Sequence, residues 1–135
     1  MLAMLPSIAM TRDGVVGVSW IGRSRDESGA WGENRLYFAA SLDGGNRFTA
    51  AVEVTEASSH PATKANARTG TELPAGGHYM GLAARADGVF QLLWSDSRNG
   101  VFEVFTATAT VNRTGHGQAG GLRKARAQTP AGRLR

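Results

Sequence analysis

An internal repeat constrains this chain more than any other feature of its sequence. Two stretches, Ile8–Trp20 (IAMTRDGVVGVSW) and Leu82–Trp94 (LAARADGVFQLLW), align with a constant offset of 74 residues. Each is an apolar run, an Asp-Gly pair and a second apolar run that ends in tryptophan. Asp-Gly between two β-rich runs favours a tight hairpin, because the turn needs a positive φ that glycine adopts freely. The repeat therefore predicts two equivalent β-hairpins.

Further β-rich segments follow both hairpins. A third strand is expected at Arg35–Ala40 in the first copy and at Val101–Ala107 in the second, and a fourth near Thr49–Val54. The link between the second and third strands is the short Ser95–Gly100 segment in the second copy and a longer loop, Gly22–Glu33, in the first. The sequence thus predicts a four-stranded antiparallel meander that is used twice.

An all-β fold of about two propeller blades fits this pattern best. Each blade of a β-propeller lies between two neighbours, so apolar character is expected on both faces of each sheet. We place a partial propeller at residues 1–111, with blade one at about 6–56, a loop at 57–77 and blade two at about 78–111. Trp20 and Trp94 are expected to pack between blades. The alternative is a single up-and-down sandwich whose hairpins resemble each other by chance.

The positive charge of the chain is concentrated in its last residues. Residues 1–111 hold 9 Lys and Arg against 11 Asp and Glu, whereas residues 112–135 hold 6 basic residues and no acidic one. This Gly- and Arg-rich tail has too little apolar surface to offset its ordering entropy, so we expect it to be disordered. It also lacks aromatic residues for stacking on bases. We therefore expect no specific nucleic-acid partner, the alternative being nonspecific contact of the tail with phosphate.

Composition excludes several classes of protein. The chain has no cysteine, which excludes a disulfide scaffold, a thiol nucleophile and a cysteine zinc site. Its three histidines are scattered, so we expect no metal site and no cofactor. The apolar runs are too short for a transmembrane helix, and the first ten residues lack the pattern of a signal peptide.

A second motif lies between the third and fourth strands of the first copy. Ser41-Leu-Asp43-Gly-Gly45-Asn-Arg-Phe48 has the form S-x-D-x-G-x-x-(W/F). The Asp43 carboxylate is expected to accept backbone N–H groups across a tight turn, and Ser41 to bond to the same loop. Gly45 permits a positive φ, and Phe48 is expected to plug the base of the turn.

This octapeptide resembles the Asp box, or bacterial neuraminidase repeat, of sialidase-like β-propellers. The segment Tyr79–Asp96 is also similar to a late blade of sialidases, where a tyrosine and a leucine precede an Asp-Gly turn and an apolar strand. The resemblance implies a six-bladed propeller of the glycoside-hydrolase type. It implies cleavage of a terminal sialic acid, or a related acidic sugar, by a tyrosine nucleophile, an exception to the usual carboxylate pair.

Two residues match functional positions of that family. Tyr79 would be the nucleophile, and Arg35 would be one of the three arginines that bind the substrate carboxylate, for which a guanidinium fork is well suited. The alternatives are that Tyr79 packs at a strand start and that Arg35 is structural. The chain departs from the family at Met80, where sialidases have serine, and at Trp94-Ser95, where Tyr-Glu is frequent. The acid aspartate, the glutamate base and the Arg-Ile-Pro segment have no counterpart in this sequence.

Four further residues are candidates for roles at a site or in a turn. Asp96 and Arg98 flank a turn and are expected to stabilise it as a pair. Trp31, in a Gly-rich loop, is suited to stack on a sugar face. His78, beside Tyr79, is suited to tune a nearby group at neutral pH, since histidine titrates in that range.

The functional expectation is a partial sialidase-like protein that is inactive alone. Since two blades would leave two apolar faces in water, we expect the C-terminal portion of a longer propeller, or self-association. The alternative function is a noncatalytic Asp-box propeller that binds carbohydrate or protein. The expected partners are an acidic sugar or glycan and the missing blades. The resemblance suggests secretion or a periplasmic location, although no signal peptide is recognised, so the compartment stays open.

Overall fold

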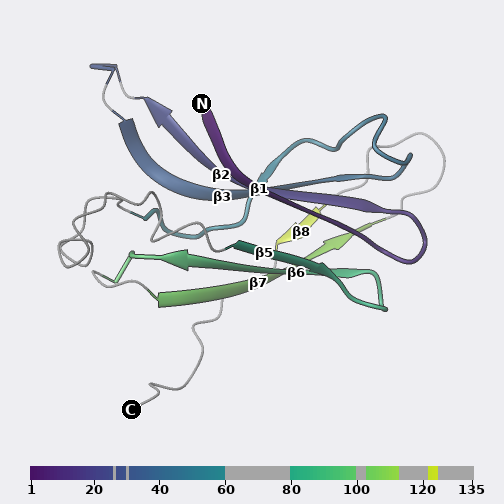
Figure 1. The fold of residues 1–135 in the computed structure, drawn as a ribbon. Coiled ribbons are helices and arrows are strands. Elements are labelled where there is room, and N and C mark those ends of the chain that lie inside the picture. The colour runs from purple at the N-terminus through teal and green to yellow at the C-terminus, as the bar shows by residue number, and fades with distance from the viewer. Residues whose placement is uncertain (26, 30, 60–79, 100–102, 113–121, 125–135) are drawn as a thin grey trace, which may run out of the picture.

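The computed structural model describes the chain except for residues 26, 30, 60–79, 100–102, 113–121 and 125–135 (Figure 1). Every regular element of the described residues is a β-strand, so the predicted all-β class is confirmed. Within these residues there is no helix with the length and apolar character needed to cross a membrane.

The strands form two antiparallel sheets, which we call sheet A and sheet B. Sheet A has the order β1-β2-β3-β4, and sheet B has the order β5-β6-β7-β8. The strands are β1 (Leu2–Met10), β2 (Val16–Arg25), β3 (Trp31–Ser41), β4 (Val52–Glu53), β5 (Met80–Ala84), β6 (Val89–Asp96), β7 (Glu103–Val111) and β8 (Leu122–Lys124). Both sheets are meanders, because each strand pairs with the next one along the chain.

Both Asp-Gly pairs form the hairpin turns that the repeat predicts. Gly14 and Gly88 have φ angles of 85° and 79°. In the first turn the Thr11 N–H donates to the Val15 carbonyl at 2.9 Å, and in the second the Arg85 N–H donates to Val89 at 2.8 Å. The two turns therefore share a geometry that depends on glycine at the same position.

The predicted long loop between the second and third strands is mostly strand. β2 continues to Arg25 and β3 begins at Trp31, and Gly22, Arg23 and Arg25 pair with Arg35, Asn34 and Trp31 of β3. The expected Gly22–Glu33 loop is thus wrong. Ladder hydrogen bonds use the backbone alone, so polar side chains at the end of a sheet do not prevent the strands from continuing.

The two ends of the described chain also differ from expectation. β1 begins at Leu2, before the predicted boundary at about residue 6, and its register with β2 shifts between Met4 and Ser7. Pro6 lacks an N–H for the ladder, and Leu5 before it has a φ of 53°.

At the other end, Leu122–Lys124 lies in the tail predicted to be disordered but pairs with β7. The prediction is wrong for these three residues, since an unpaired strand edge accepts backbone from any sequence.

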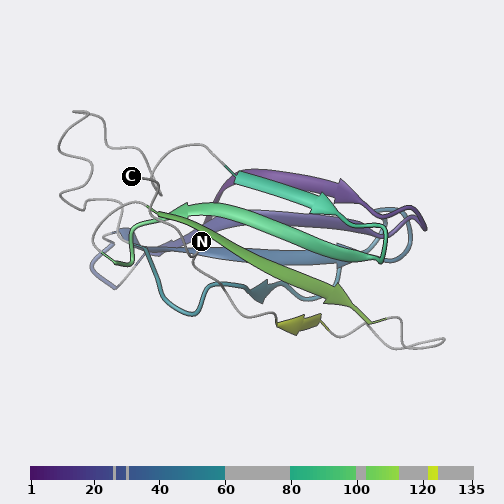
Figure 2. The same cartoon turned by 90° about the horizontal axis from the view of Figure 1, so that it is seen from below.

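The two sheets lie face to face, with each strand of sheet B over its counterpart in sheet A (Figure 2). β1 and β5 run side by side in the same direction in both views, without pairing in one sheet. The backbones of the two sheets approach each other most closely at these two strands. Their spacing therefore widens from the first strand of each sheet towards the later ones.

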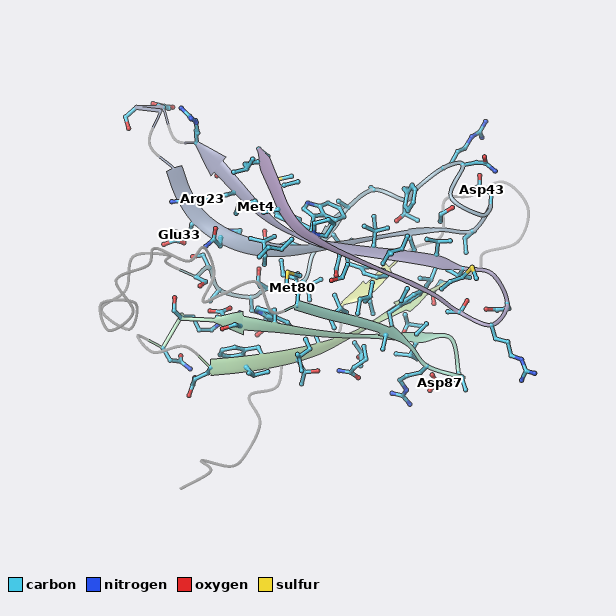
Figure 3. All side chains as sticks on the ribbon, in the orientation of Figure 1. Met4, Arg23, Glu33, Asp43, Met80 and Asp87 are labelled. Carbon is cyan, nitrogen blue, oxygen red and sulfur yellow. The ribbon has the colours of Figure 1, made fainter. Side chains whose placement is uncertain are left out.

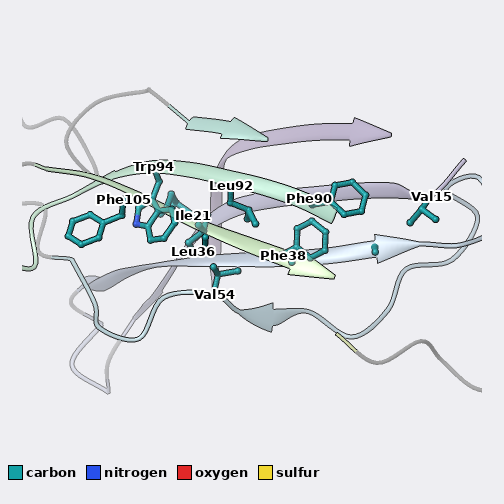
Figure 4. Packing of buried hydrophobic residues seen from close by; sticks show 12 residues of the cluster. Val15, Ile21, Leu36, Phe38, Val54, Phe90, Leu92, Trp94 and Phe105 are labelled. Atoms are coloured by element: carbon teal, nitrogen blue, oxygen red, sulfur yellow. The ribbon is translucent and has the colours of Figure 1, made fainter. Parts of the chain in front are cut away.

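A single apolar core fills the space between the sheets (Figure 4). We call the contributing surface of sheet A the A-front face; it presents Ile21 of β2 and Leu36 and Phe38 of β3. The Phe38 and Phe90 rings meet at 5.2 Å between centroids. The contributing surface of sheet B, the B-back face, consists of Phe90, Leu92, Trp94, Phe105, Ala107 and Ala109, all buried.

The two surfaces that meet in this core are not equivalent in the repeat. By the offset of 74, Trp94 on the B-back face corresponds to Trp20, which lies on the opposite surface of sheet A from the core. The correspondence extends to aromatic packing: Trp94 stacks on Phe105, and Trp20 stacks on Tyr37, each at 5.9 Å between centroids. We call this outer surface the A-back face. The sheets thus pack front to back, as successive units do in a repeat array.

Gly17 on the A-front face leaves the room that the Phe90 ring occupies. A Cβ atom at position 17 would lie 2.5 Å from Cε1 of Phe90, which is far closer than van der Waals contact. Phe90 is fully buried, so its ring has no solvent-facing space into which to move. The absence of a side chain at Gly17 is therefore part of the fit between the sheets.

We expect Gly17→Ala to lower the free energy of unfolding by about 1–3 kcal/mol, because overpacking displaces the Phe90 ring. Urea unfolding followed by tryptophan fluorescence measures this change. Gly81→Ala is the matched control, since its Cβ would lie at an ordinary 3.6 Å from Cβ of Leu93. We expect the control to change stability by less than about 1 kcal/mol. Equal effects of both substitutions would contradict the proposed fit at Gly17.

Candidate functional site

The loops of the two sheets gather at opposite ends of the strands (Figure 3). One end carries both Asp-Gly turns and the Asp-box loop, with Asp43 and Asp87; we call it the Asp-box end. The other end carries Arg23 and Glu33 beside the connection between β2 and β3, and we call it the far end. Each predicted site residue that the structure describes belongs to one of these ends or to the surface of sheet A between them.

The Asp-box loop between β3 and β4 has the internal hydrogen bonds that its sequence predicts. The Ser41 hydroxyl donates to Oδ1 of Asp43 at 2.8 Å and accepts the N–H of Gly45 at 2.8 Å. The Asp43 carboxylate also accepts the N–H of Arg47 at 2.8 Å. Gly44 and Gly45 have positive φ angles of 71° and 97°. Ser41, Asp43 and Gly45 therefore hold the turn through the local contacts that the sequence predicts.

These contacts favour the ionised form of Asp43. The hydrogen bond from the Arg47 backbone, followed by that from the Ser41 hydroxyl, lowers the pKa of the Asp43 carboxyl below its ordinary value. The Asp43 side chain is exposed, and its Oδ1 atom accepts both of these hydrogen bonds within the loop. Asp43 therefore holds the turn and is poorly suited to act as a general acid.

The prediction for Phe48 is wrong. Its side chain is 48% exposed and does not plug the base of the turn. Thr49 closes the loop instead: its N–H donates to the Ala40 carbonyl at 2.8 Å, and its hydroxyl accepts the Ala40 N–H at 3.2 Å. Because backbone and hydroxyl groups complete the closure, no aromatic plug is needed there.

Arg35 lies on the A-back face near the start of β3. Its Nη1 atom forms an ion pair with Oε1 of Glu53 on β4 at 2.5 Å, and both side chains are partly exposed. The hydrogen bond and the charge of Glu53 raise the pKa of the Arg35 guanidinium above its ordinary value. Arg35 is thus always charged, and Glu53 fixes one edge of its guanidinium.

Other residues predicted for the site lie outside the described residues or change place. Tyr79 and His78 belong to the segment 60–79, which lies outside them. Met80, the next residue in the chain, opens β5. Trp31, predicted in a loop, is the first residue of β3. The contact that would bring Tyr79 and Arg35 into one site therefore stays a prediction.

Asp96 and Arg98 form the turn-stabilising pair that the sequence predicts. Asp96 is buried at 1% exposure, and its carboxylate accepts the Arg98 backbone N–H at 2.8 Å and the Arg98 Nε–H at 2.9 Å. The Trp94 indole N–H donates to the same carboxylate at 3.1 Å. The Arg98 guanidinium also lies 4.4 Å from the centroid of the Phe105 ring, a cation–π distance. These contacts join the core to the far end of sheet B.

Ser59 links the two sheets at the far end. Its backbone pairs with Asn34 of β3, through N–H to carbonyl bonds of 3.0 and 2.9 Å. Its hydroxyl accepts the Ser97 N–H at 3.1 Å and lies 3.0 Å from the Ser97 hydroxyl. Both polar side-chain atoms of Asn34 are buried without a hydrogen-bond partner among the described residues. The segment after β4 is thus tied to β3 and to the turn after β6.

Sequence reasoning missed both residues of this link. Asn34 occupies an A-front position of β3, where the in-and-out alternation of the strand places a side chain towards sheet B. The link at Asn34 is made by its backbone, and its side-chain atoms have no hydrogen-bond partner among the described residues, so the side-chain type did not indicate Ser59 as the partner. Ser59 had no signal in the sequence, because its partner Ser97 is 38 residues away in the chain.

The described residues do not bring together the groups that glycoside hydrolysis needs. The carboxylates of Asp43, Glu53 and Asp96 each bind a neighbouring residue and lie on separate elements. No group of three or more His, Asp or Glu side chains in this described part could hold a metal ion. The arrangement supports sheet packing and loop geometry, while Arg35 offers a fixed cation on the A-back face.

We expect Asp43→Asn to increase the hydrogen-exchange rate of the Arg47 amide, since an amide oxygen is a weaker acceptor than a carboxylate. Because the Asp43 pKa is lowered by folding, its stabilising effect is present above the pKa of an unfolded aspartate, about 3.9. It is lost as the pH falls through the lower pKa of the folded state. Exchange measured by NMR checks both effects. Asp13→Asn in the first Asp-Gly turn should leave the Arg47 amide unchanged.

Asp96→Ala is expected to lower the free energy of unfolding by about 3–5 kcal/mol, because it leaves a largely buried guanidinium without its partner. Chemical unfolding with circular dichroism gives this value. The control is Asp87→Ala, which removes an ion pair with Arg85 whose side chains are half exposed. It should lower stability by about 1 kcal/mol or less. A small loss for Asp96→Ala would refute a supporting role for the buried pair.

Comparison with known proteins does not identify a family for the chain. No protein-family model matches the sequence, and no curated protein gives a significant match. The assignment of a function therefore depends on the packing of the two sheets and on the Asp-box loop.

Proposed function

We propose that this chain forms two neighbouring blades of an Asp-box β-propeller of the sialidase-like, glycoside-hydrolase type, and that it does not hydrolyse a glycoside alone. The substrate class of the completed propeller would be a terminal sialic acid or a related acidic sugar. Arg35 would bind the substrate carboxylate, and Tyr79 would be the nucleophile.

The front-to-back packing of the two sheets carries this proposal. A sandwich made from two copies of one meander would most simply bury the same face of each copy. Here the B-back face, with stacked Trp94 and Phe105, is buried, while the equivalent A-back face, with stacked Trp20 and Tyr37, is not part of the core. Packing of unlike faces is how adjacent blades of a ring meet, since each blade must contact a different neighbour on either side.

The spacing of the sheets supports the same architecture. Blades of a propeller are closest at their innermost strands and diverge outwards. β1 and β5 are the strands at which the two backbones approach most closely. The small Ala9 lies on the A-front side of β1, whereas Phe38 on β3 fills the wider part of the interface. The distribution of side-chain size therefore fits a wedge.

The Asp-box loop supports the sialidase-like assignment more weakly. Its Ser41, Asp43 and Gly45 make the contacts that an Asp box requires, and the loop joins the third and fourth strands of its sheet. This loop is a structural feature of the blade and does not take part in chemistry. It favours the family without selecting between catalytic and noncatalytic members.

One observation favours the alternative, a noncatalytic propeller that binds carbohydrate or protein. Glu53 already neutralises Arg35, which weakens its attraction for a second carboxylate. A guanidinium has five N–H donors, so the edge away from Glu53 still permits a contact with an acidic sugar. The two functions consequently differ in whether sugar binding needs Arg35.

We expect the purified chain to release no fluorophore from an aryl sialoside, because the acid, the base and the remaining arginines are not recognised in its sequence. Release above the blank that disappears in Tyr79→Phe would contradict this expectation. Saturation-transfer NMR with sialic acid separates the two functions. Binding that is lost in Arg35→Ala and kept in the control Arg85→Ala supports the sialidase-like assignment. Binding of neutral glycans that survives Arg35→Ala supports the alternative.

A further inference from the structure

The A-back face is an apolar surface that sheet B does not cover. Ile8 and Met10 of β1 are 70% and 66% exposed. By their register with β2, they share this face with Val18 and Val16, and the Trp20–Tyr37 stack continues it onto β3. The Arg35–Glu53 pair at its edge is neutral overall. Contiguous exposed apolar surface of this kind marks an interaction site.

The repeat indicates what kind of surface covers this face. At the equivalent positions of sheet B, Leu92 and Trp94 are buried in the core and Leu82 packs against it. Their partner there is the A-front face, the front of the preceding sheet. A front face of the same kind is therefore the expected partner of the A-back face.

The chain itself carries a second front face, which we call the B-front face. It consists of side chains of β6 and β7 that point away from the core, and Gln91, Leu93, Val104, Thr106 and Thr108 belong to it. Leu93 and Val104 are 45% and 47% exposed. None of these five side chains is charged, so burying them desolvates no ion. It is thus a chemically suitable partner for the A-back face.

Compared with the two faces that meet in the core, the exposed B-front face has larger side chains and the exposed A-back face has smaller ones at equivalent positions. In the observed interface Gly17 on the front faces Phe90 on the back. At the equivalent positions the B-front face has the larger Gln91, and the A-back face has the smaller Val16. Likewise, the position of Ser19 on the A-front face is taken by the larger Leu93 on the B-front face. The position of Leu92 on the B-back face is taken by the smaller Val18 on the A-back face. Interfaces tolerate such exchanges when the total volume is kept.

We propose that the A-back face of one chain binds the B-front face of a second copy, in a head-to-tail arrangement. This proposal deepens the blade assignment and rests on it, since it names the source of the sheet that covers the A-back face. The contact would repeat the front-to-back packing already present within the chain. Because each copy keeps one free front and one free back face, the contact would continue into a closed ring or a longer array.

Sedimentation velocity of the full chain tests the proposal. We expect the average mass to exceed that of a monomer and to rise with protein concentration. Ile8→Glu places a charge on the A-back face, and Leu93→Glu places one on the B-front face. Each variant alone should be a monomer, because each has lost one of the two complementary faces.

The mixture of both variants is the decisive sample. Ile8→Glu retains a competent B-front face and Leu93→Glu a competent A-back face, so the mixture should form a dimer and nothing larger. Leu42→Glu, in the Asp-box loop at a similar 42% exposure, is the matched control and should associate like the unmodified chain. Circular dichroism verifies that all variants keep their strands.

Two results would overturn the proposal. A monomer at all concentrations for the unmodified chain excludes self-association through these faces. Association that Ile8→Glu abolishes but Leu93→Glu leaves intact indicates contact between two A-back faces. Neither result alters the packing within the chain, which the Gly17→Ala measurement tests separately. Failure of the self-association proposal is therefore distinguishable from failure of the blade assignment.

Discussion

The contact between unlike faces of two equivalent sheets is the interaction on which the rest of this structure depends. It places Phe90 over Gly17 and next to Phe38, and it buries Trp94. Such packing does not close on itself, because a face used in one sheet stays free in the other. The apolar A-back face, centred on Trp20, is thus a direct consequence of how the core is built.

Polar groups maintain this arrangement at its ends without taking part in the core. At the far end, the Asp96 carboxylate accepts hydrogen bonds from the indole N–H of Trp94 and from the guanidinium of Arg98. It therefore connects an aromatic residue of the interface to the turn after β6. Ser59 crosses from sheet A to Ser97 of sheet B. At the other end, the Ser41–Asp43 loop satisfies its own backbone and contributes no side chain to the interface.

The sequence predicts the parts of this fold that depend on local conformation. Asp13-Gly14, Asp87-Gly88 and the Ser41–Gly45 loop are readable because glycine φ angles and short-range hydrogen bonds fix them. What depends on distant partners was not readable. Ser59 contacts Ser97, which is 38 residues away in the chain. β8 pairs with the free edge of β7. The loop that Phe48 was expected to close is closed by hydrogen bonds of Thr49. Pattern alone also could not show which face of each sheet is buried.

Which face of each sheet is buried also bears on function. In a ring built from unlike faces, a ligand site is assembled from strand ends of several sheets, so no single sheet holds a complete set of reactive groups. Arg35 with its partner Glu53 illustrates this, since it offers one oriented cation and no neighbouring acid or base. The Asp box lies at the opposite end from Arg23 and Glu33. A site built around Arg35 would take its remaining groups from whatever covers the A-back face, on which Arg35 lies.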